Sequence, residues 1–368
     1  MGPHKVNNKD ASHSKGDTKE RRKERKEWKE MKLLKRAKLQ NDEKIVSEES
    51  NENLKIKVPE LSTLSIAVPG SILDNAQSPE LRTYLAGQIA RAACVFKVHE
   101  IVVFDDLGNK NIADKAMEED DNEGKTVRRC CVQLARILQY LECPQYLRKY
   151  FFPLHKDLQY AGLLNPLDTP HHLRQNDEFA FREGVTTNLP AKAGKGIVNC
   201  GLLHDVIVNK SLPPGMRVTV RLLPQREGSK KLHGEIVPPS CPSVETGTYW
   251  GYTVRIAQSL CEVFSQSPYV GGYDLTIGTS ERGDKVDLLA HNSLQYHHVI
   301  VVFGGLQGLE AALDNDEVLT VDDPALLFDH YLNTCPEQGS RTIRTEEAVL
   351  ISLAELRTKL LPKHSCTT

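Results

Sequence analysis

Apolar residues are spread unevenly along this chain of 368 residues, and their spacing divides it into four stretches. Residues 1 to 57 carry few apolar positions and cannot bury a core. Helix-like and strand-like apolar runs alternate in residues 61 to 169 and again in residues 247 to 361, as is typical of an α/β domain. Residues 170 to 246 show short β-type runs between Gly, Pro and Lys clusters. The pattern predicts an α/β domain that is split by a small β-rich insertion and preceded by a tail.

The first part of the predicted α/β domain begins with a β-α-β unit. Leu64 to Val68 reads as a strand, and residues 101 to 104 (IVVF) read as a second strand. Between them, Ser78 is a suitable N-cap and Pro79 a suitable first residue for a helix that runs to about Ala93. Such a unit implies parallel strands joined by a right-handed crossover.

Two segments of unusual composition lie between this unit and the insertion. Residues 105 to 127 are strongly acidic and are expected to form an exposed, mobile loop. Residues 146 to 156 interleave aromatic and basic side chains, a composition that suits stacking on unpaired RNA bases. The same composition also suits a helix that packs on a sheet with its charges in solvent.

The insertion at 170 to 246 has the length and the strand count of a five-stranded OB-like barrel. Its basic composition suits a module that grips RNA phosphates, and it also suits a protein-binding module. The basic residues are Lys192, Lys195, Lys210, Arg217, Arg221, Arg226, Lys230 and Lys231.

The second part of the α/β domain contains three strand-end loops that matter for function. GTSERG begins at residue 278, Gly304 and Gly305 follow the unbroken apolar strand at 298 to 303, and NTCPEQGSRTIR begins at residue 333. Parallel strands bring their carboxyl ends to one edge of a sheet, where open α/β folds bind ligands. The last loop leads into an apolar helix from Ala348 to Leu356, for which Thr345 is the predicted N-cap. A plain strand-to-helix connection is the alternative interpretation of this loop.

Composition narrows the class of protein. The formal net charge of −2 implies no overall attraction to a polyanion, so any RNA surface depends on local charge. Nine cysteines without a C-x-x-C pair indicate a reduced intracellular protein and no metal site. No apolar run is long enough to span a bilayer, so no membrane contact is expected. The tail is rich in Lys, Arg and Glu, so it is expected to be partly helical and to bind RNA phosphates or an import receptor. The alternative is that the tail is solvated and mostly disordered.

Two motifs carry a family resemblance. GSRTIRTEEA, together with VVFGGLQGLEA at 301 to 311, resembles the paired signature of the SPOUT class of RNA methyltransferases, and among these the ribosomal-RNA uridine-N3 methyltransferases. From about Leu61 to Leu361 the chain resembles the eukaryotic and archaeal branch that carries an OB-like insertion. The resemblance implies a C-terminal trefoil knot that binds S-adenosylmethionine, a homodimer, and an RNA target, with rRNA expected.

The resemblance also implies roles for individual residues. Arg344 and Arg91 are the candidates to stabilise a uracil anion, and Glu281 and Glu346 are the candidates to accept its proton. The residues expected to contact the cofactor, largely through backbone groups, are Thr279, Ser280, Arg282, Phe303, Gly304, Gly305, Leu306, Asn333, Thr334, Gln338, Ser340, Thr342, Ile343 and Thr345.

Two alternative functions remain open at this point. Gly87 to Ala93 resembles the G-x-x-x-R-x-A motif of ribose-methylating SPOUT enzymes, but those enzymes have Asn where this chain has Leu85. This departure disfavours a ribose 2′-hydroxyl target. The other alternative is a scaffold that keeps the fold and binds RNA or spindle and centromere proteins. By resemblance, the protein is expected in the nucleus, nucleolus and cytoplasm, and on the mitotic spindle and kinetochore.

Overall fold

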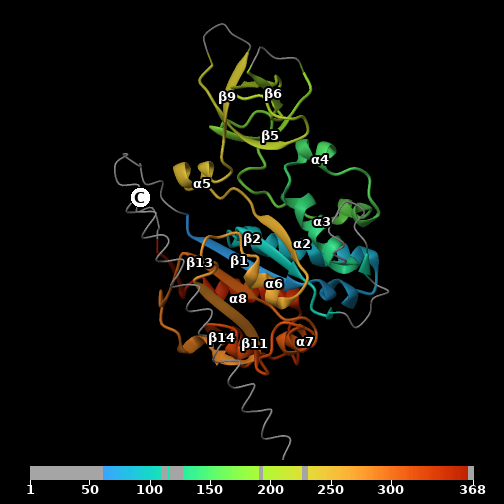
Figure 1. Cartoon of the computed structure of the whole chain (residues 1–368), viewed down its shortest axis with the longest axis vertical. Helices are drawn as coiled ribbons and strands as arrows, with labels where there is room; N and C mark the ends of the chain where they lie inside the picture. The colour runs from blue at the N-terminus through green and yellow to red at the C-terminus, as the bar shows by residue number, and fades with distance from the viewer. Residues whose placement is uncertain (1–60, 109–114, 117–126, 190–193, 226–230, 364–368) are drawn as a thin grey trace, which may run out of the picture.

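The computed structural model describes residues 61–108, 115–116, 127–189, 194–225 and 231–363. The predicted basic tail and most of the acidic segment lie outside these residues. The described chain forms an α/β body with a small β-barrel at one end (Figure 1). The α/β body is built from residues on both sides of the barrel in sequence, as the apolar pattern predicts.

Within the described residues, six parallel strands form the sheet of the body, in the order β10-β2-β1-β13-β11-β14. The predicted β-α-β unit is confirmed, because β1 and β2 are parallel neighbours joined through helix α2. In sequence order the strands are β1 (Thr63–Pro69), β2 (Glu100–Phe104), β10 (Thr253–Ala257), β11 (Leu275–Lys285), β13 (His298–Val302) and β14 (His330–Asn333).

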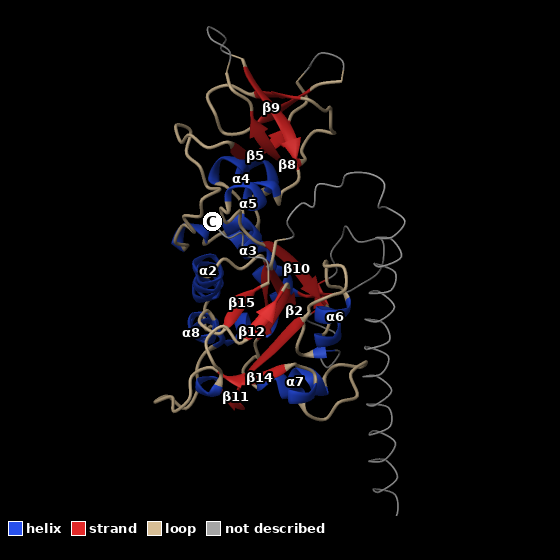
Figure 2. Cartoon of the chain, turned by 90° about the vertical axis from the view of Figure 1, so that its left-hand side faces the viewer, coloured by secondary structure: helices blue, strands red, loops and turns tan. Residues whose placement is uncertain are grey.

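Both faces of the sheet are covered, since alternate residues of a strand point to opposite sides. On β13, Val299 and Val301 pack with α2 (Pro79–Val95), α3 (Arg129–Glu142) and α8 (Thr345–Leu356). Ile300 and Val302 pack on the other face with α6 (Leu260–Ser265) and α7 (Gly308–Asp314). Figure 2 shows α2 and α8 on one side of the strands and α6 on the other. The continuous apolar run of β13 follows from this burial on both faces.

The starts of α2 and α8 agree with the sequence to within one residue. Ser78 caps α2 by accepting a hydrogen bond from the backbone N–H of Leu81, and Pro79 is the first residue of the helix. The predicted N-cap of α8, Thr345, is wrong by one position, because Arg344 is the N-cap and Thr345 is already helical. The Thr345 hydroxyl instead donates to the carbonyl oxygen of Gly304, 3.1 Å away. Thr345 therefore ties the helix to the glycine loop after β13.

The insertion folds as the predicted five-stranded barrel, closed in the order β5-β6-β7-β9-β8 among the described residues. Its core is a cluster of valines and Cys200. Its strands are β5 (Phe181–Thr186), β6 (Gly196–Asn199), β7 (Val206–Val208), β8 (Arg217–Leu222) and β9 (Leu232–Val237).

Smaller elements complete the described structure. Helix α4 (Gln145–Phe151) leads toward the barrel and α5 (Cys241–Thr246) returns from it. Near the C-terminus, β15 (Leu360–Pro362) pairs in parallel with β12 (Leu294–Tyr296). None of the described helices is long and apolar enough to cross a bilayer. The remaining short elements are β3 (Lys115–Ala116), β4 (Val127–Arg128) and the 3-10 helices η1 (Gly70–Asn75), η4 (Lys156–Leu158), η5 (Ala161–Leu163), η6 (Val286–Leu288) and η7 (Pro324–Leu326).

Contacts between barrel and body use several side chains that the sequence suggested for RNA. The Tyr146 hydroxyl donates to the backbone carbonyl of Glu183 at 2.7 Å, so this aromatic residue packs against the barrel. Arg217 pairs with Glu142 and Glu183, and Arg221 pairs with Glu245. These basic side chains are engaged within the protein, whereas Lys195 and Lys210 are exposed. Lys192, Arg226 and Lys230 lie outside the described residues.

Candidate functional site

A polar groove runs along the carboxyl ends of β11, β13 and β14, with a volume of about 1030 Å³. The end of β11 and the loops after β13 and β14 form one wall, and the start of α8, the first half of α2 and the η1 segment form the other. The three segments predicted from sequence therefore meet at one edge of the sheet, although residues 278–283 are an irregular part of β11 and not the predicted loop. This is the usual ligand position in an open parallel α/β sheet.

The groove brings together every residue expected at the cofactor except Ser340. The Ser340 hydroxyl donates to the carbonyl of Thr342 at 2.8 Å, and the Ser340 carbonyl accepts from the side-chain amide of Gln338. Ser340 thus shapes the loop after β14 without lining the groove. The expected residues that line it are Thr279, Ser280, Arg282, Phe303, Gly304, Gly305, Leu306, Asn333, Thr334, Gln338, Thr342, Ile343 and Thr345.

Side-chain hydrogen bonds fix the loops around the groove. The Asn333 amide donates to the carbonyl of Glu281 at 3.0 Å, which joins the loop after β14 to the end of β11. The Thr334 and Ser352 hydroxyls lie 2.6 Å apart and join the same loop to α8. The Thr279 hydroxyl donates to the carbonyl of Val302 at 3.1 Å. A groove held this way is preorganised, which favours orientation of a ligand.

Gly304 and Gly305 line the groove, and internal packing also requires glycine at both positions. A Cβ on Gly304 would lie 2.8 Å from the backbone of Gly308 and Leu309. A Cβ on Gly305 would lie 2.9 Å from the Asp106 carboxylate and 3.2 Å from the Ser71 hydroxyl. The chain at these positions approaches its own neighbours, and any larger residue displaces them.

The four candidate catalytic residues do not lie together. Arg344, Glu281 and Glu346 line the groove, and the first two are exposed. Glu346 is buried, with 8% of its surface exposed, in the first turn of α8. Arg91 lies outside the groove, where its guanidinium donates to the carbonyl of Leu167. The structure therefore separates Arg91 from Arg344 and Glu281, while Glu346 lies between the two sets.

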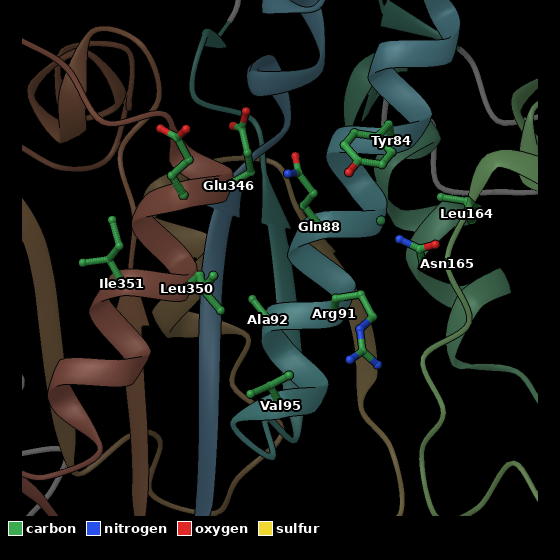
Figure 3. Close-up of a pocket in the computed structure, with 12 residues that line it drawn as sticks. Tyr84, Gln88, Arg91, Ala92, Val95, Leu164, Asn165, Glu346, Leu350 and Ile351 are labelled. Atoms are coloured by element: carbon green, nitrogen blue, oxygen red, sulfur yellow. The ribbon is translucent and has the colours of Figure 1, made fainter. Parts of the chain in front are cut away.

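Arg91 lines a second hollow, of about 500 Å³, between α2, α8 and the segment around Asn165 (Figure 3). Its walls are largely apolar and include Ala92, Val95 and Leu350. This hollow adjoins the groove, because four residues line both of them: Tyr84, Gln88, Glu346 and Glu347.

Sequence reasoning missed several groove residues. Asn75 and Gln77 reach the groove from η1 and the turn before α2, and Tyr84 and Gln88 reach it from α2. A one-turn spacing of Tyr84 and Gln88 places them on one helix face, but only the packing of α2 beside α8 brings that face to the groove. No motif in the sequence marks this proximity.

Asp106 lies beside the groove and is buried. The expectation that the acidic segment is exposed from residue 105 onward is therefore wrong for its first two residues. The Asp106 carboxylate accepts a 2.5 Å hydrogen bond from the Ser71 hydroxyl and another from the Ser71 backbone N–H. Burial raises the pKa of the Asp106 carboxyl, and the bonds from Ser71 oppose that rise. Asp105 is also buried, 3.2 Å from Arg128. These two residues directly follow β2 and anchor its end to neighbouring segments.

The groove carries charges of both signs, which limits the ligands that fit it. Arg282 and Glu310 form an ion pair at 3.2 Å on its rim, and Arg344 and Glu347 lie at the start of α8. The Glu347 carboxylate accepts the backbone N–H of Arg344 at 3.0 Å. Such a groove suits a zwitterionic ligand better than a simple anion or cation.

Comparison with known proteins shows which family the chain is similar to. A family model described as "Putative RNA methyltransferase" matches residues 63–356. The chain is 57% identical over 367 residues to the 28S rRNA (uridine-N(3))-methyltransferase of Drosophila melanogaster, covering 99% of this chain and 74% of that protein. It is 58% identical to the enzyme of the same name from Homo sapiens, covering 81% of this chain and 79% of that protein. The enzyme of that name from Mus musculus is 60% identical over 80% of this chain and 76% of its own length. The chain therefore belongs to this family of RNA methyltransferases.

Proposed function

We propose that this protein transfers a methyl group from S-adenosylmethionine to N3 of a uridine in large-subunit ribosomal RNA. The observation that carries the proposal is its identity of 57–60% to relatives named as 28S rRNA uridine-N3 methyltransferases. The groove at the sheet edge supports it, since the loops after β13 and β14 that line it hold residues of the two sequence motifs.

The groove fits S-adenosylmethionine in size and in chemistry. The paired Arg282 and Glu310 suit the carboxylate and ammonium of its methionine part. The exposed Leu306 and the partly buried Ile343 offer apolar contact to a flat base. When bound, the cofactor supplies an electrophilic methyl group on a sulfonium sulfur.

Methylation of uridine at N3 requires loss of the imide proton, because neutral N3 carries no free lone pair in the ring plane. A carboxylate of the groove, Glu281 or Glu346, would accept that proton. The N3–C bond then forms as the C–S bond breaks, and the Arg344 guanidinium would stabilise the negative charge on the uracil oxygens. The base has to be unpaired or flipped out to present N3, since that atom lies on the Watson–Crick edge.

We also propose the finer fold of the SPOUT class, with a trefoil knot in the C-terminal part. Contacts between the last segment and earlier parts of the chain support it. Hydrogen bonds join the loop after β14 to Glu281 and helix α8 to Gly304. Strand β15 pairs with β12, which lies between β11 and β13 in sequence. Stretching the protein between residues 61 and 363 should leave an extended chain shorter than the contour of that segment. A full contour length would contradict the knot.

A homodimer is the proposed working form, as the resemblance implies. Exposed apolar side chains on the outer faces of α2 and α8, namely Leu81, Val95 and Leu350, support burial against a second copy. Light scattering on the purified protein should give twice the mass of one chain, and a mass of one chain across micromolar concentrations would contradict the dimer.

The direct test of the function is the product. Large-subunit rRNA incubated with the protein and S-adenosylmethionine should gain N3-methyluridine, measured by mass spectrometry of its nucleosides. A 2′-O-methyl nucleotide in its place would show a ribose-methylating enzyme. Failure to bind S-adenosylmethionine at millimolar concentration in a calorimetric titration would favour a scaffold instead.

A further inference from the structure

A small hollow on the barrel lies apart from the groove proposed for the cofactor. It has a volume of about 210 Å³ and lies between the connection from β5 to β6 and the segment that follows β7. Its wall is mostly polar, and none of its residues lines the groove or the hollow beside α2. A ligand bound here is therefore distinct from the cofactor.

Two lysines from separate segments of the barrel line this hollow. Lys195 precedes β6 and Lys210 follows β7, and both residues are exposed. The backbone brings them together, because a Cβ on Gly196 would lie 2.5 Å from the carbonyl oxygen of Lys210. Two ammonium groups at one small hollow repel each other, and an anion between them would relieve that repulsion.

The described part of the chain supplies no acidic partner for either lysine. The carboxylates of the barrel strands are engaged elsewhere: Glu183 of β5 pairs with Arg217 at 2.8 Å, and Glu235 of β9 pairs with Arg221 at 3.7 Å. The exposed Ser211 lines the same hollow, and its hydroxyl forms no hydrogen bond with the described residues. The hollow thus presents two positive charges and a hydroxyl donor, which together complement the oxygens of a phosphate.

We propose that this hollow binds one backbone phosphate of the RNA substrate; the identity of that RNA rests on the proposed function. The Lys195 and Lys210 ammonium groups and the Ser211 hydroxyl donate to the phosphate oxygens. Figure 1 shows the barrel at one end of the molecule and β11 and β14, which border the groove, at the other. The phosphate therefore belongs to a nucleotide distant from the target uridine, and the contact sets the position of the RNA without reading a base.

The variants Ser211→Asp and Ser211→Asn test the charge of the hollow with side chains of nearly equal shape. The probe is the fragment of large-subunit rRNA that wild-type protein binds most tightly. Ser211→Asp should bind it about tenfold more weakly than Ser211→Asn, because a carboxylate in the hollow repels a phosphate. Both variants should bind S-adenosylmethionine equally, since Ser211 lies outside the groove. Equal RNA affinities of the two variants would overturn the proposal.

A salt titration counts the phosphate contact. In the double variant Lys195→Gln and Lys210→Gln, the dependence of log K on log salt should become shallower by about one, and by the same amount for RNAs of different sequence. Lys97→Gln is the control, because Lys97 is an exposed lysine of the body just before β2 and should leave the slope unchanged. A wild-type slope in the double variant would contradict the contact.

RNAs with a single uncharged methylphosphonate linkage then locate the phosphate. At one position the substitution should weaken binding to wild-type protein and should not weaken binding to the double lysine variant further, because that contact is already lost. Additive losses at every position would overturn the proposal.

The hollow and the proposed function fail by different results. RNA treated with wild-type protein and S-adenosylmethionine that gains no N3-methyluridine overturns the proposed function. Equal RNA binding by Ser211→Asp and Ser211→Asn overturns the hollow, whatever product the wild-type protein forms.

Discussion

Arg344 stands at the start of α8 with its side chain exposed on the groove, while its backbone N–H is held by Glu347. Its guanidinium is positioned to stabilise charge that develops only as the uracil becomes anionic. Arg344→Ala should therefore lower kcat about 100-fold and change S-adenosylmethionine affinity little. Single-turnover methylation and a calorimetric titration measure the two effects.

Arg357 provides the control for this prediction, because it is an exposed arginine at the other end of the same helix. Arg357→Ala removes the same charge far from the groove and should leave turnover unchanged. A loss of cofactor affinity as large as the loss of kcat in Arg344→Ala would show that Arg344 binds the cofactor and does not act on the uracil.

Gly305→Val should destabilise the protein, since its Cβ would lie 2.9 Å from the Asp106 carboxylate and 3.2 Å from the Ser71 hydroxyl. Overpacking of this kind costs about 1–3 kcal/mol, which lowers Tm by about 5 °C in a protein of this size. Thermal unfolding measures the effect. Gly339→Val is the control, because no atom lies within 4 Å of a Cβ there. Equal Tm values for the two variants would contradict the packing role of Gly305.

At the level of residues, the sequence predicts the groove residues that lie in motifs. It does not predict the residues that other segments bring to the groove or pack beside it. The glycines after β13 and the residues after β14 were predictable, because a buried strand followed by turn residues marks a ligand edge. Asp106 was not, since its acidic surroundings suggest solvent while its burial depends on Ser71 of the neighbouring segment. Gln88 was missed for the same reason: only helix packing brings it to the groove.

At the level of elements, helix and strand types followed from periodicity, while their pairing did not. The apolar run at 298 to 303 predicts a strand buried on both faces, and β13 is one. The pairing of β13 with β1 joins residues more than 200 positions apart, which no local pattern encodes. In the barrel, the parallel pairing of β7 with β9 is likewise a result of closure.

The end of α3 joins the barrel through one buried carboxylate. Glu142 accepts from Arg217 of β8 at 2.6 Å and from His171 at 3.0 Å, and Arg217 also reaches Glu183 of β5 at 2.8 Å. Burial alone would raise the pKa of Glu142, but the hydrogen bond from His171 and the charge of Arg217 lower it to about 2. His172, whose ring contacts the Glu142 backbone carbonyl, has a pKa lowered to about 4 by burial.

The lowered pKa makes the junction sensitive to acid. A carboxyl whose pKa is lower in the folded protein than in the unfolded chain contributes stability above its ordinary pKa of 4.5, and loses that contribution as the pH falls toward 2. For Glu142 the contribution is about 3 kcal/mol. Glu142→Gln should therefore reduce stability at pH 7 and flatten the loss of stability between pH 4.5 and 2. Denaturant unfolding across this range measures both, and an unchanged acid profile would contradict the role of Glu142.

At the level of the whole molecule, the apolar pattern predicts both modules but not how firmly they are joined. The sequence suggests an insertion whose basic residues are free for RNA, whereas Arg217 and Tyr146 bind the barrel to the body. Trp250 strengthens the junction, as its indole N–H donates to Glu183 at 2.7 Å. The barrel therefore holds a defined position over the body (Figure 1). An RNA held by the barrel would reach the groove at a fixed distance, which suits one target position in a large structured RNA.

Removal of the barrel tests whether the barrel binds the RNA while the body binds the cofactor. Deletion of residues 172–245 with a short linker leaves Glu142 without Arg217, and an unpaired buried charge costs several kcal/mol. The deletion should therefore be combined with Glu142→Gln, which removes that charge. The combined variant should bind S-adenosylmethionine normally, because every groove residue lies outside the deleted segment. Its RNA affinity should fall, and the dependence of log K on log salt should become shallower as phosphate contacts of the barrel are lost. RNA affinity equal to wild type across a salt titration would show that the body, and not the barrel, holds the RNA.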